Sequence, residues 1–422
     1  MNSPPSIVVN KRTYQWPDRP LVVICVDGSE PGDSSSDPDG YMEQALEAGC
    51  MPYLKKAIEQ GTWRMAECVV PSFTNPNNLS IVTGVPPSVH GICGNFFYDP
   101  LTDAEIMMND PQLLRAPTIL AGFAARGASV AVITAKDKLR RLLGSGLTFG
   151  EGGSVCFSAE KADAATLREH GIENVLDLVN SPLPNVYSAQ LSEFVFAAGL
   201  KLMNTRRPDI LYLSTTDYVQ HKHAAGSPKA NEFYAMMDNY WRRLDEAGVT
   251  LAVTADHGMK AKHDVNGVPK VVYLQSILDA WLGTAVARVI CPITDPYVVH
   301  HGALGGFVTV YLPSSTDVPA LLERVSNLEG IECALSRRDG CERFELPGDR
   351  LGDILVVADS NTVIGRRPDQ HDLSGLDAPL RSHGGLSEQR VPFVLNRPTP
   401  ALSIGKGLRN YDIFDAALNY VR

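Results

Sequence analysis

Six short apolar runs recur along the chain and predict the strands of one sheet. The runs are nearly continuous and rich in β-branched residues, which is typical of strands buried on both faces of a parallel sheet. They are Leu21–Val26, Ala128–Thr134, Ile210–Ser214, Val249–Thr254, Ile354–Ala358 and Val391–Leu395. Helix-like patterns lie between them: in Asn231–Ala247 apolar residues repeat at helical spacing, and Gly248 follows as a stop. This alternation predicts an α/β fold with right-handed crossovers and helices on both faces of a mainly parallel sheet.

The stretch from residue 264 to 352 departs from this alternation. Gly306–Leu312, Asp317–Leu328 and Ile331–Leu335 have the patterns of a strand, a helix and a strand, and no chemically reactive residues follow the two strands. We therefore interpret residues 264–352 as a small inserted α+β cap domain. Residues 1–263 and 353–422 would form the catalytic core, with the chain returning to the main sheet at Asp353–Asp359.

Composition narrows the class of protein. The chain has 422 residues, of which 44% are hydrophobic and 20% charged, as is ordinary for a globular protein. Its net charge of -10 argues against a nucleic-acid-binding surface, which needs a basic excess. No apolar run reaches the roughly 18 residues of a membrane helix, and the N-terminal segment has no apolar signal region. The eight cysteines are scattered without a CxxC pair, so we interpret them as reduced thiols of a cytoplasmic protein.

Residues that can bind metal follow several of the apolar runs. Ligands of doubly wound sheets bind beyond the carboxyl ends of the strands. The polar residues at these ends are Asp27, Asp217 with His221 four residues later, the pair Asp256-His257, and His383 near the last run. Each one alone could be a helix cap, a turn former or a structural histidine. Together they are the mixed oxygen and nitrogen ligands that suit zinc.

The segment Pro71–Asn95 contains a candidate nucleophile. Thr74 precedes an Asn-Pro step and a helix-like stretch, Asn78–Gly84. A hydroxyl at the start of a helix can be an ordinary N-cap. It can equally be a nucleophile that the helix dipole and a metal ion activate, and the local pattern leaves both interpretations open.

Two lysines stand at the same predicted edge of the sheet. Lys136 and Lys138 follow the second apolar run. If the chain is still extended there, residues two apart point to the same side, and both ammonium groups face one target. The alternative is a pair of solvated lysines in a basic turn with Arg140 and Arg141.

These elements together resemble the alkaline phosphatase superfamily. The similarity is closest to the branch that holds nucleotide pyrophosphatases/phosphodiesterases and phosphonoacetate hydrolases. In that branch a threonine nucleophile precedes a Pro-Asn step and an IVTG, HGI and Asn series. The matching elements here are Thr74, Pro76-Asn77, Ile81–Gly84, His90–Ile92 and Asn95. The branch's early Asp, DxxxH, DHGM and late HG also occur in order between residues 27 and 384, so the resemblance implies an alkaline-phosphatase-like core.

The resemblance implies two zinc ions per chain. One zinc site would consist of Asp217, His221 and His383, and the other of Asp27, Asp256, His257 and the Thr74 oxygen. Asn95 would donate a hydrogen bond to a phosphoryl oxygen. Lys136 and Lys138 are similar to the Lys-x-Lys pair with which phosphonoacetate hydrolases hold the substrate carboxylate.

The function implied by the resemblance is hydrolysis of the C–P bond of phosphonoacetate to acetate and phosphate through a phosphothreonine at Thr74. Thr74 is followed by Asn75–Asn78, whereas the diesterases tend to have Phe-Pro-Asn-His after the nucleophile. The alternatives are a phosphodiesterase or nucleotide pyrophosphatase with the same dinuclear site, and a non-catalytic, metal-stabilised binding protein. We expect a small-molecule phosphonate substrate and no nucleic-acid or membrane partner. The sequence leaves open a homodimer and the roles of His223 and His263.

Overall fold

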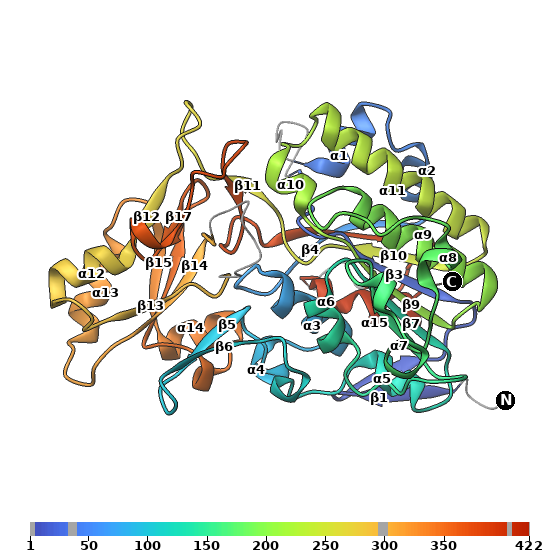
Figure 1. Ribbon diagram of the computed structural model, residues 1–422, viewed down its shortest axis with the longest axis horizontal. Coiled ribbons are helices and arrows are strands. Elements are labelled where there is room, and N and C mark those ends of the chain that lie inside the picture. The colour runs from blue at the N-terminus through green and yellow to red at the C-terminus, as the bar shows by residue number, and fades with distance from the viewer. Residues whose placement is uncertain (1–4, 33–39, 294–302, 403–406, 422) are drawn as a thin grey trace.

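The protein has two lobes built on separate sheets (Figure 1). The computed structural model describes residues 5–32, 40–293, 303–402 and 407–421. The larger lobe contains a seven-stranded sheet, and the smaller lobe a four-stranded sheet. Within the described ranges, the helices are too short or too polar to cross a bilayer. The eight cysteines, which all lie in these ranges, form no disulfide.

The seven-stranded sheet has the order β4-β19-β10-β3-β9-β7-β8. Its members are β3 (Leu21–Cys25), β4 (Thr62–Glu67), β7 (Val130–Thr134), β8 (Val155–Ser158), β9 (Ile210–Ser214), β10 (Thr250–Thr254) and β19 (Arg390–Leu395). The strands β10, β3, β9, β7 and β8 are parallel, and β19 runs antiparallel to both β10 and β4. The predicted α/β fold with a mainly parallel sheet is confirmed, and five of the six predicted strands lie in this sheet.

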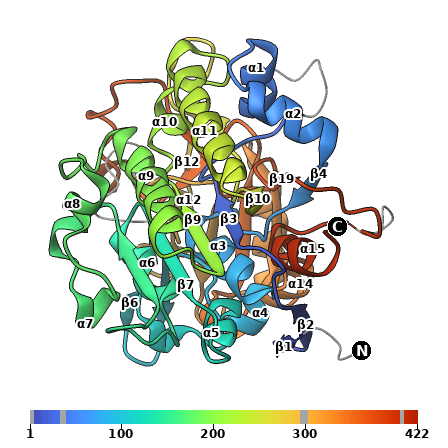
Figure 2. The ribbon, with the colours of Figure 1, turned by 90° about the vertical axis from the view of Figure 1, so that its right-hand side faces the viewer.

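Helices cover both faces of the large sheet. On one face lie α1 (Tyr41–Glu47), α2 (Pro52–Gln60), α9 (Gln190–Thr205) and α11 (Pro228–Glu246), and α9 and α11 run side by side (Figure 2). On the other face lie α3 (Thr74–Thr83), α5 (Ile119–Ala124), α6 (Asp137–Leu143) and α15 (Ile413–Asn419). Alternate residues of each strand point to opposite faces, and both faces are covered, so every residue of β3 is buried. This explains the continuous apolar runs.

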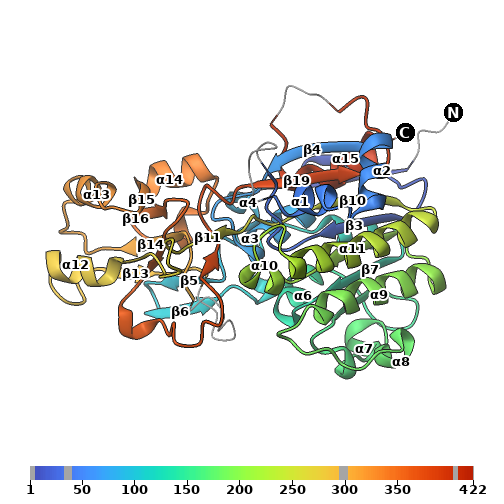
Figure 3. The same cartoon turned by 90° about the horizontal axis from the view of Figure 1, so that it is seen from above.

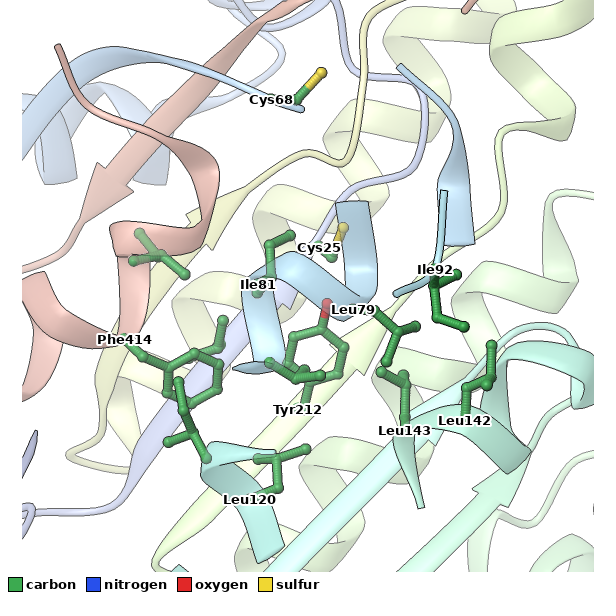
Figure 4. Close-up of a cluster of buried hydrophobic side chains, with 14 of the residues drawn as sticks. Cys25, Cys68, Leu79, Ile81, Ile92, Leu120, Leu142, Leu143, Tyr212 and Phe414 are labelled. Carbon is green, nitrogen blue, oxygen red and sulfur yellow. The ribbon is translucent and has the colours of Figure 1, made fainter. Parts of the chain in front are cut away.

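Helix α3 lies deep in the core of this second face. Its residues Leu79 and Ile81 pack in the cluster around Tyr212 of β9, whose ring is stacked on Phe414 of α15 with centroids 6.3 Å apart (Figure 4). Leu120, Leu142 and Leu143 from α5 and α6 belong to the same cluster. The start of α3 is therefore fixed relative to the ends of the neighbouring strands.

The smaller lobe holds an antiparallel sheet of order β13-β14-β16-β15. Its elements are α12 (Leu274–Leu282), β13 (Arg288–Ile290), β14 (Phe307–Tyr311), α13 (Val318–Ser326), β15 (Ile331–Ser336), α14 (Arg337–Phe344) and β16 (Ile354–Ala358). The strand, helix and strand predicted between residues 306 and 335 are confirmed.

The predicted return of the chain to the main sheet at Asp353–Asp359 is wrong. Strand β16 pairs with β14 and β15 in the smaller lobe. Its Leu355 and Val357 pack into one core cluster and its Val356 into another, so this strand too is buried on both faces. A continuous apolar run of this kind fits either sheet. The boundary expected at residue 352 therefore falls inside the smaller lobe, and its status as a separate cap domain stays a prediction.

Short paired strands join the lobes (Figure 3). The chain leaves the large sheet through β11 (Lys260–Ala261) and returns through β18 (Arg381–Ser382), and these two strands pair with each other. Strand β12 (Val271–Tyr273) pairs with β17 (Val363–Gly365) in the smaller lobe. The hairpin of β5 (Phe96–Asp99) and β6 (Ala104–Met107) reaches the smaller lobe, where the Tyr98 and Tyr311 rings meet edge to face at 4.9 Å.

The remaining elements are short. They are β1 (Ser6–Val9), β2 (Arg12–Gln15), α4 (Pro87–His90), α7 (Leu167–His170), α8 (Val175–Val179) and α10 (Tyr218–Lys222), with 3₁₀ turns at Pro111–Leu113, Ala162–Ala164, Gly348–Arg350, Pro368–Gln370 and Asn410–Asp412.

A buried ion pair stabilises the crossing between the lobes. Lys262 Nζ lies 2.9 Å from both Glu388 Oε1 and the Ser360 carbonyl oxygen, and neither charged side chain is exposed. Removing one member of such a pair leaves the other charge buried without compensation. We expect Lys262→Met to lower the free energy of unfolding by about 3–5 kcal/mol, as measured by urea denaturation followed by circular dichroism.

The double variant Lys262→Met/Glu388→Gln tests this cause. Glutamine removes the stranded charge and can still accept the hydrogen bond from the Gly385 amide, which is 2.9 Å long in the structure. The double variant should therefore be more stable than Lys262→Met alone. Equal stability of the two variants would mean that the buried charge is not the cause.

Candidate metal centre and active site

The parallel register of three adjacent strands brings three aspartates to one edge of the sheet. Cys25 at the end of β3 pairs with Thr254 of β10 and with Ser214 of β9. Asp27, Asp256 and Asp217 follow these paired residues by two or three positions. The strand ends thus place all three carboxylates together, as the sequence predicts.

The first group of candidate ligands consists of Asp217, His221 and His383, whose ligand atoms lie within 4.8 Å of one another. Asp217 is the N-cap residue of α10, and His221 lies one turn later. Asp217 Oδ2 is 2.8 Å from His221 Nε2 and 3.7 Å from His383 Nε2. The structure therefore brings together the three residues predicted for one zinc site.

The second group surrounds His257. Its Nε2 atom lies 3.2 Å from Asp27 Oδ1, 3.3 Å from Thr74 Oγ1 and 3.9 Å from Asp256 Oδ2. The structure thus also gathers the four residues predicted for the other zinc site. The ligand atoms that lie within 4.8 Å of one another here are those of Asp27, Asp217 and His257, so Asp217 belongs to both groups.

The hydrogen bonds of the three histidines leave their Nε2 atoms for a metal. Nδ1 of His221 lies 2.8 Å from the Arg381 carbonyl oxygen, Nδ1 of His257 lies 2.8 Å from that of Gly258, and Nδ1 of His383 lies 2.7 Å from that of Ser72. A carbonyl oxygen only accepts, so each Nδ1 carries the hydrogen. Metal-bound histidines are oriented in this way, and the donor set fits divalent ions such as zinc.

Burial and the closeness of charged neighbours shift the pKa values of several residues in the site. Burial, together with repulsion by Asp217 and Asp256, holds the pKa of Asp27 well above its usual value. Burial alone would lower the pKa of His257, but Asp256 and Asp27 raise it to about 10. Burial and the neighbouring His257 lower the pKa of His383 well below its usual value. The cluster attracts positive charge, which bound cations can supply.

Thr74 stands in the first turn of α3 and does not cap it. The N-cap residue is Phe73, so the N-cap interpretation of Thr74 is wrong. The hydroxyl of the half-buried Thr74 instead lies beside His257, while the buried Asn77 holds the preceding loop by accepting a 2.7 Å hydrogen bond from the Val69 amide.

Asn78 is a site residue that sequence reasoning did not identify. Its Nδ2 donates to Asp256 Oδ2 at 3.0 Å, and its Oδ1 accepts from the Tyr212 hydroxyl at 2.8 Å. Asn78 lies four residues after Thr74, hence on the same face of the helix. That spacing was the available signal, but the partner Asp256 is 178 residues away.

The two lysines occupy different elements. Lys136 is extended at the N-cap position of α6, with its Nζ 5.3 Å from the ring centroid of Tyr187. Lys138 lies inside α6, because the helix begins at Asp137. The chain is therefore not extended through both lysines, so the condition under which the two side chains would point to the same side is not met. Both still follow β7, whose Thr134 pairs with Ser214 of β9.

Asn95 is linked to the start of α3 through Met108. Met108 donates its amide to the Asn95 carbonyl oxygen at 2.8 Å and accepts from Asn75 Nδ2 at 3.1 Å. Asn95 Oδ1 is buried and has no hydrogen-bond partner among the described residues. Within those residues, His223 and His263 belong to neither ligand group.

The family model described as type I phosphodiesterase / nucleotide pyrophosphatase matches residues 21–386 of the chain. The chain is also similar to phosphonoacetate hydrolase from Sinorhizobium meliloti, known from crystal structures in complex with phosphonoformate and with phosphonoacetate. The identity is 56%, the TM-score is 0.94, and the similarity covers 99% of each chain.

Matches to curated relatives are shorter. An uncharacterised pyrophosphatase/phosphodiesterase of Schizosaccharomyces pombe is 35% identical over 83 residues, which span 19% of this chain and 17% of that protein. A phosphonoacetate hydrolase of Penicillium oxalicum is 69% identical over 32 residues, which span 7% of this chain and 44% of that protein. The matched segments thus cover less than half of either relative.

The ligand groups lead to a prediction about metal content. We expect the purified protein to bind close to two divalent ions per chain, as measured by elemental analysis. His383→Ala should lower the content toward one. Asp217→Ala should have a larger effect, because its carboxylate belongs to both groups. Since histidine must be neutral to bind a metal ion and the pKa of His257 in the metal-free site is raised to about 10, bound metal competes with protons and affinity should fall steadily as the pH is lowered. Active protein without any bound divalent metal would rule out the site.

Proposed function

The chain belongs to the type I phosphodiesterase/nucleotide pyrophosphatase family, and on that premise we propose that it cleaves the C–P bond of phosphonoacetate to acetate and phosphate. The observation that carries this proposal is the similarity to the Sinorhizobium meliloti phosphonoacetate hydrolase over almost the whole chain. The position of Thr74 Oγ1 beside His257 supports the same reaction. The experiment that tests it is an assay of phosphate release from a panel of phosphonates and phosphate esters.

Two zinc ions are the proposed cofactors. Asp217, His221 and His383 would hold one, and Asp27, Asp256 and His257 with the Thr74 oxygen would hold the other. When bound, the ions would supply Lewis-acid chemistry, which lowers the pKa of a hydroxyl and offsets charge on phosphoryl oxygens. The three aspartates carry a formal charge of about −3, which two divalent ions more than neutralise.

Thr74 is the proposed nucleophile. Its Oγ1 would pass its proton to water and attack phosphorus, so that a P–O bond forms as the C–P bond breaks. The positive end of the α3 dipole lies at Thr74 and stabilises negative charge there. Water would then attack the phosphothreonine, releasing phosphate and restoring the Thr74 hydroxyl. Asn95, which is connected to Asn75 through Met108, is the proposed donor to a phosphoryl oxygen.

Lys136 and Lys138 are the proposed carboxylate-binding residues. The electron pair of the C–P bond passes to the CH₂ carbon, which is too basic to leave unless its charge spreads onto the substrate carboxylate. Ammonium groups at that carboxylate stabilise the developing charge, and a proton from water then gives acetate. The position of both lysines after β7, beside the strand that precedes Asp217, supports this role.

A phosphodiesterase or nucleotide pyrophosphatase with the same site is the second candidate, favoured by the family model and by the Schizosaccharomyces pombe relative. Relative rates on phosphonoacetate and on p-nitrophenyl phosphate esters would separate the two. The cytoplasmic location and the homodimer stay predictions, the former supported by the free cysteines.

We expect Thr74→Ala to abolish nearly all turnover while leaving the metals bound, because Thr74 is one donor among several at its site. Thr74→Ser keeps a hydroxyl and should retain part of the rate. Steady-state phosphate release and metal analysis of the same preparations test both expectations. A Thr74→Ala variant with substantial activity would exclude the covalent route.

The lysines should affect phosphonoacetate more than substrates without a carboxylate. Lys136→Ala or Lys138→Ala should lower kcat/KM for phosphonoacetate by about 10²-fold or more. The rate on p-nitrophenyl phosphate should change little, since its leaving group needs no carboxylate clamp. The ratio of the two rates is insensitive to unfolding or metal loss, which damage both reactions.

Lys161→Ala is the matched control. Lys161 lies after the neighbouring strand β8, and its side chain is 59% exposed. The Lys161→Ala variant should leave the ratio of the rates on phosphonoacetate and p-nitrophenyl phosphate unchanged. Equal losses on both substrates in the Lys136 and Lys138 variants would contradict the clamp and favour the phosphodiesterase.

A further inference from the structure

Arg381 is a buried arginine at the crossing between the lobes, with 6% of its surface exposed. It lies in β18 opposite Ala261 of β11. Its Nε donates to the Gln220 carbonyl oxygen at 2.9 Å, and its Nη2 donates to the Met259 carbonyl oxygen at 3.1 Å and to the Tyr41 hydroxyl at 3.2 Å. One side chain therefore joins three segments that are far apart in the sequence.

Each candidate histidine ligand lies next to one of these contacts. Gln220 directly precedes His221 on α10, which lies beside β11 in two views (Figures 1 and 3). Met259 follows His257 by two residues, and His383 follows Arg381 itself by two residues. The carbonyl oxygen of Arg381 also accepts the 2.8 Å hydrogen bond from His221 Nδ1.

The contacts of the Arg381 guanidinium fix the positions of the backbone rather than pair opposite charges. Toward the described residues, each hydrogen bond of the Arg381 guanidinium goes to a neutral oxygen. Arginine stays charged and presents its donors in a rigid planar fork. Burying that charge is costly unless its donors are satisfied. The guanidinium donors of Arg381 reach their acceptor oxygens only when α10, β11 and β18 keep these positions relative to one another.

We propose that Arg381 is a positioning residue of the metal centre. It fixes the backbone on one side of each of the three histidines, and its own carbonyl oxygen holds the tautomer and ring orientation of His221. The inference rests on the proposed metal site. Its effect should be greatest at the group Asp217, His221 and His383, because two of its contacts lie at His221 and it adjoins His383.

Arg350 provides a matched control for a purely structural role. It is 7% exposed, and its Nη1 donates to the carbonyl oxygens of Gly91 and Leu113 at 2.6 and 2.8 Å. Like Arg381 it is a buried arginine that binds backbone carbonyls. Unlike the contacts of Arg381, neither of these carbonyls belongs to a residue within two positions of a candidate metal ligand.

The experiment compares Arg381→Met, Arg381→Lys and Arg350→Met with the wild-type protein. Zinc affinity is measured by competition with a chelator, and the visible absorption of the cobalt-substituted protein reports ligand geometry. The melting temperature of the metal-free protein reports general stability. We expect Arg381→Met to weaken the affinity of one zinc ion by about 10–100-fold and to change the cobalt spectrum.

Compared with Arg381→Met, the Arg381→Lys variant should recover more of the melting temperature than of the zinc affinity. The reason is that lysine keeps the charge but cannot reproduce the planar set of donors. Arg350→Met should lower the melting temperature and leave both metal readouts unchanged. If Arg381→Met does not fold, the lysine variant supplies the comparison. Wild-type affinity and spectrum in the Arg381 variants would overturn the positioning role alone. A wild-type protein that binds no metal would instead overturn the proposed metal site.

Discussion

Mutual repulsion between three clustered carboxylates, of which those of Asp27 and Asp256 are buried and that of Asp217 is partly exposed, is the interaction on which the rest of the site depends. The register of β10, β3 and β9 brings Asp27, Asp217 and Asp256 together, and burial with repulsion raises the pKa of Asp27. Neighbouring groups offset this repulsion. His257 Nε2 lies near the carboxylates of Asp27 and Asp256, and Asn78 donates a hydrogen bond to Asp256. Water screens the charges of Asp27 and Asp256 weakly because these two carboxylates are buried, so the site favours cations.

The same edge of the sheet is where the lobes meet. The chain leaves the large sheet through β11 shortly after His257 and returns through β18 directly before His383. The buried pair of Lys262 and Glu388 and the fork of Arg381 bridge this crossing. Ligand geometry and lobe packing therefore depend on the same contacts, which links the stability of the crossing to the affinity for metal.

The proposed nucleophile is placed by packing. Helix α3 is fixed by apolar contacts on the sheet, as Leu79 and Ile81 show, and by hydrogen bonds of two buried asparagines. Asn77 orders the loop before Thr74, and Asn78 ties the helix to Asp256. The hydroxyl thus reaches the candidate metal ligands from a rigid element, a requirement for the proposed in-line attack on a bound phosphoryl group.

The sequence by itself determined the α/β class, five strands of the main sheet and the residues that gather at its edge, because apolar runs and the polar residues after them are local features. Only the tertiary structure decided that β16 belongs to the smaller lobe, since a strand buried on both faces suits either sheet. It also decided the start of α6 before Lys138 and the roles of Asn78 and Arg381. The roles of Asn78 and Arg381 depend on hydrogen bonds between residues more than a hundred positions apart, and no local pattern records such pairings.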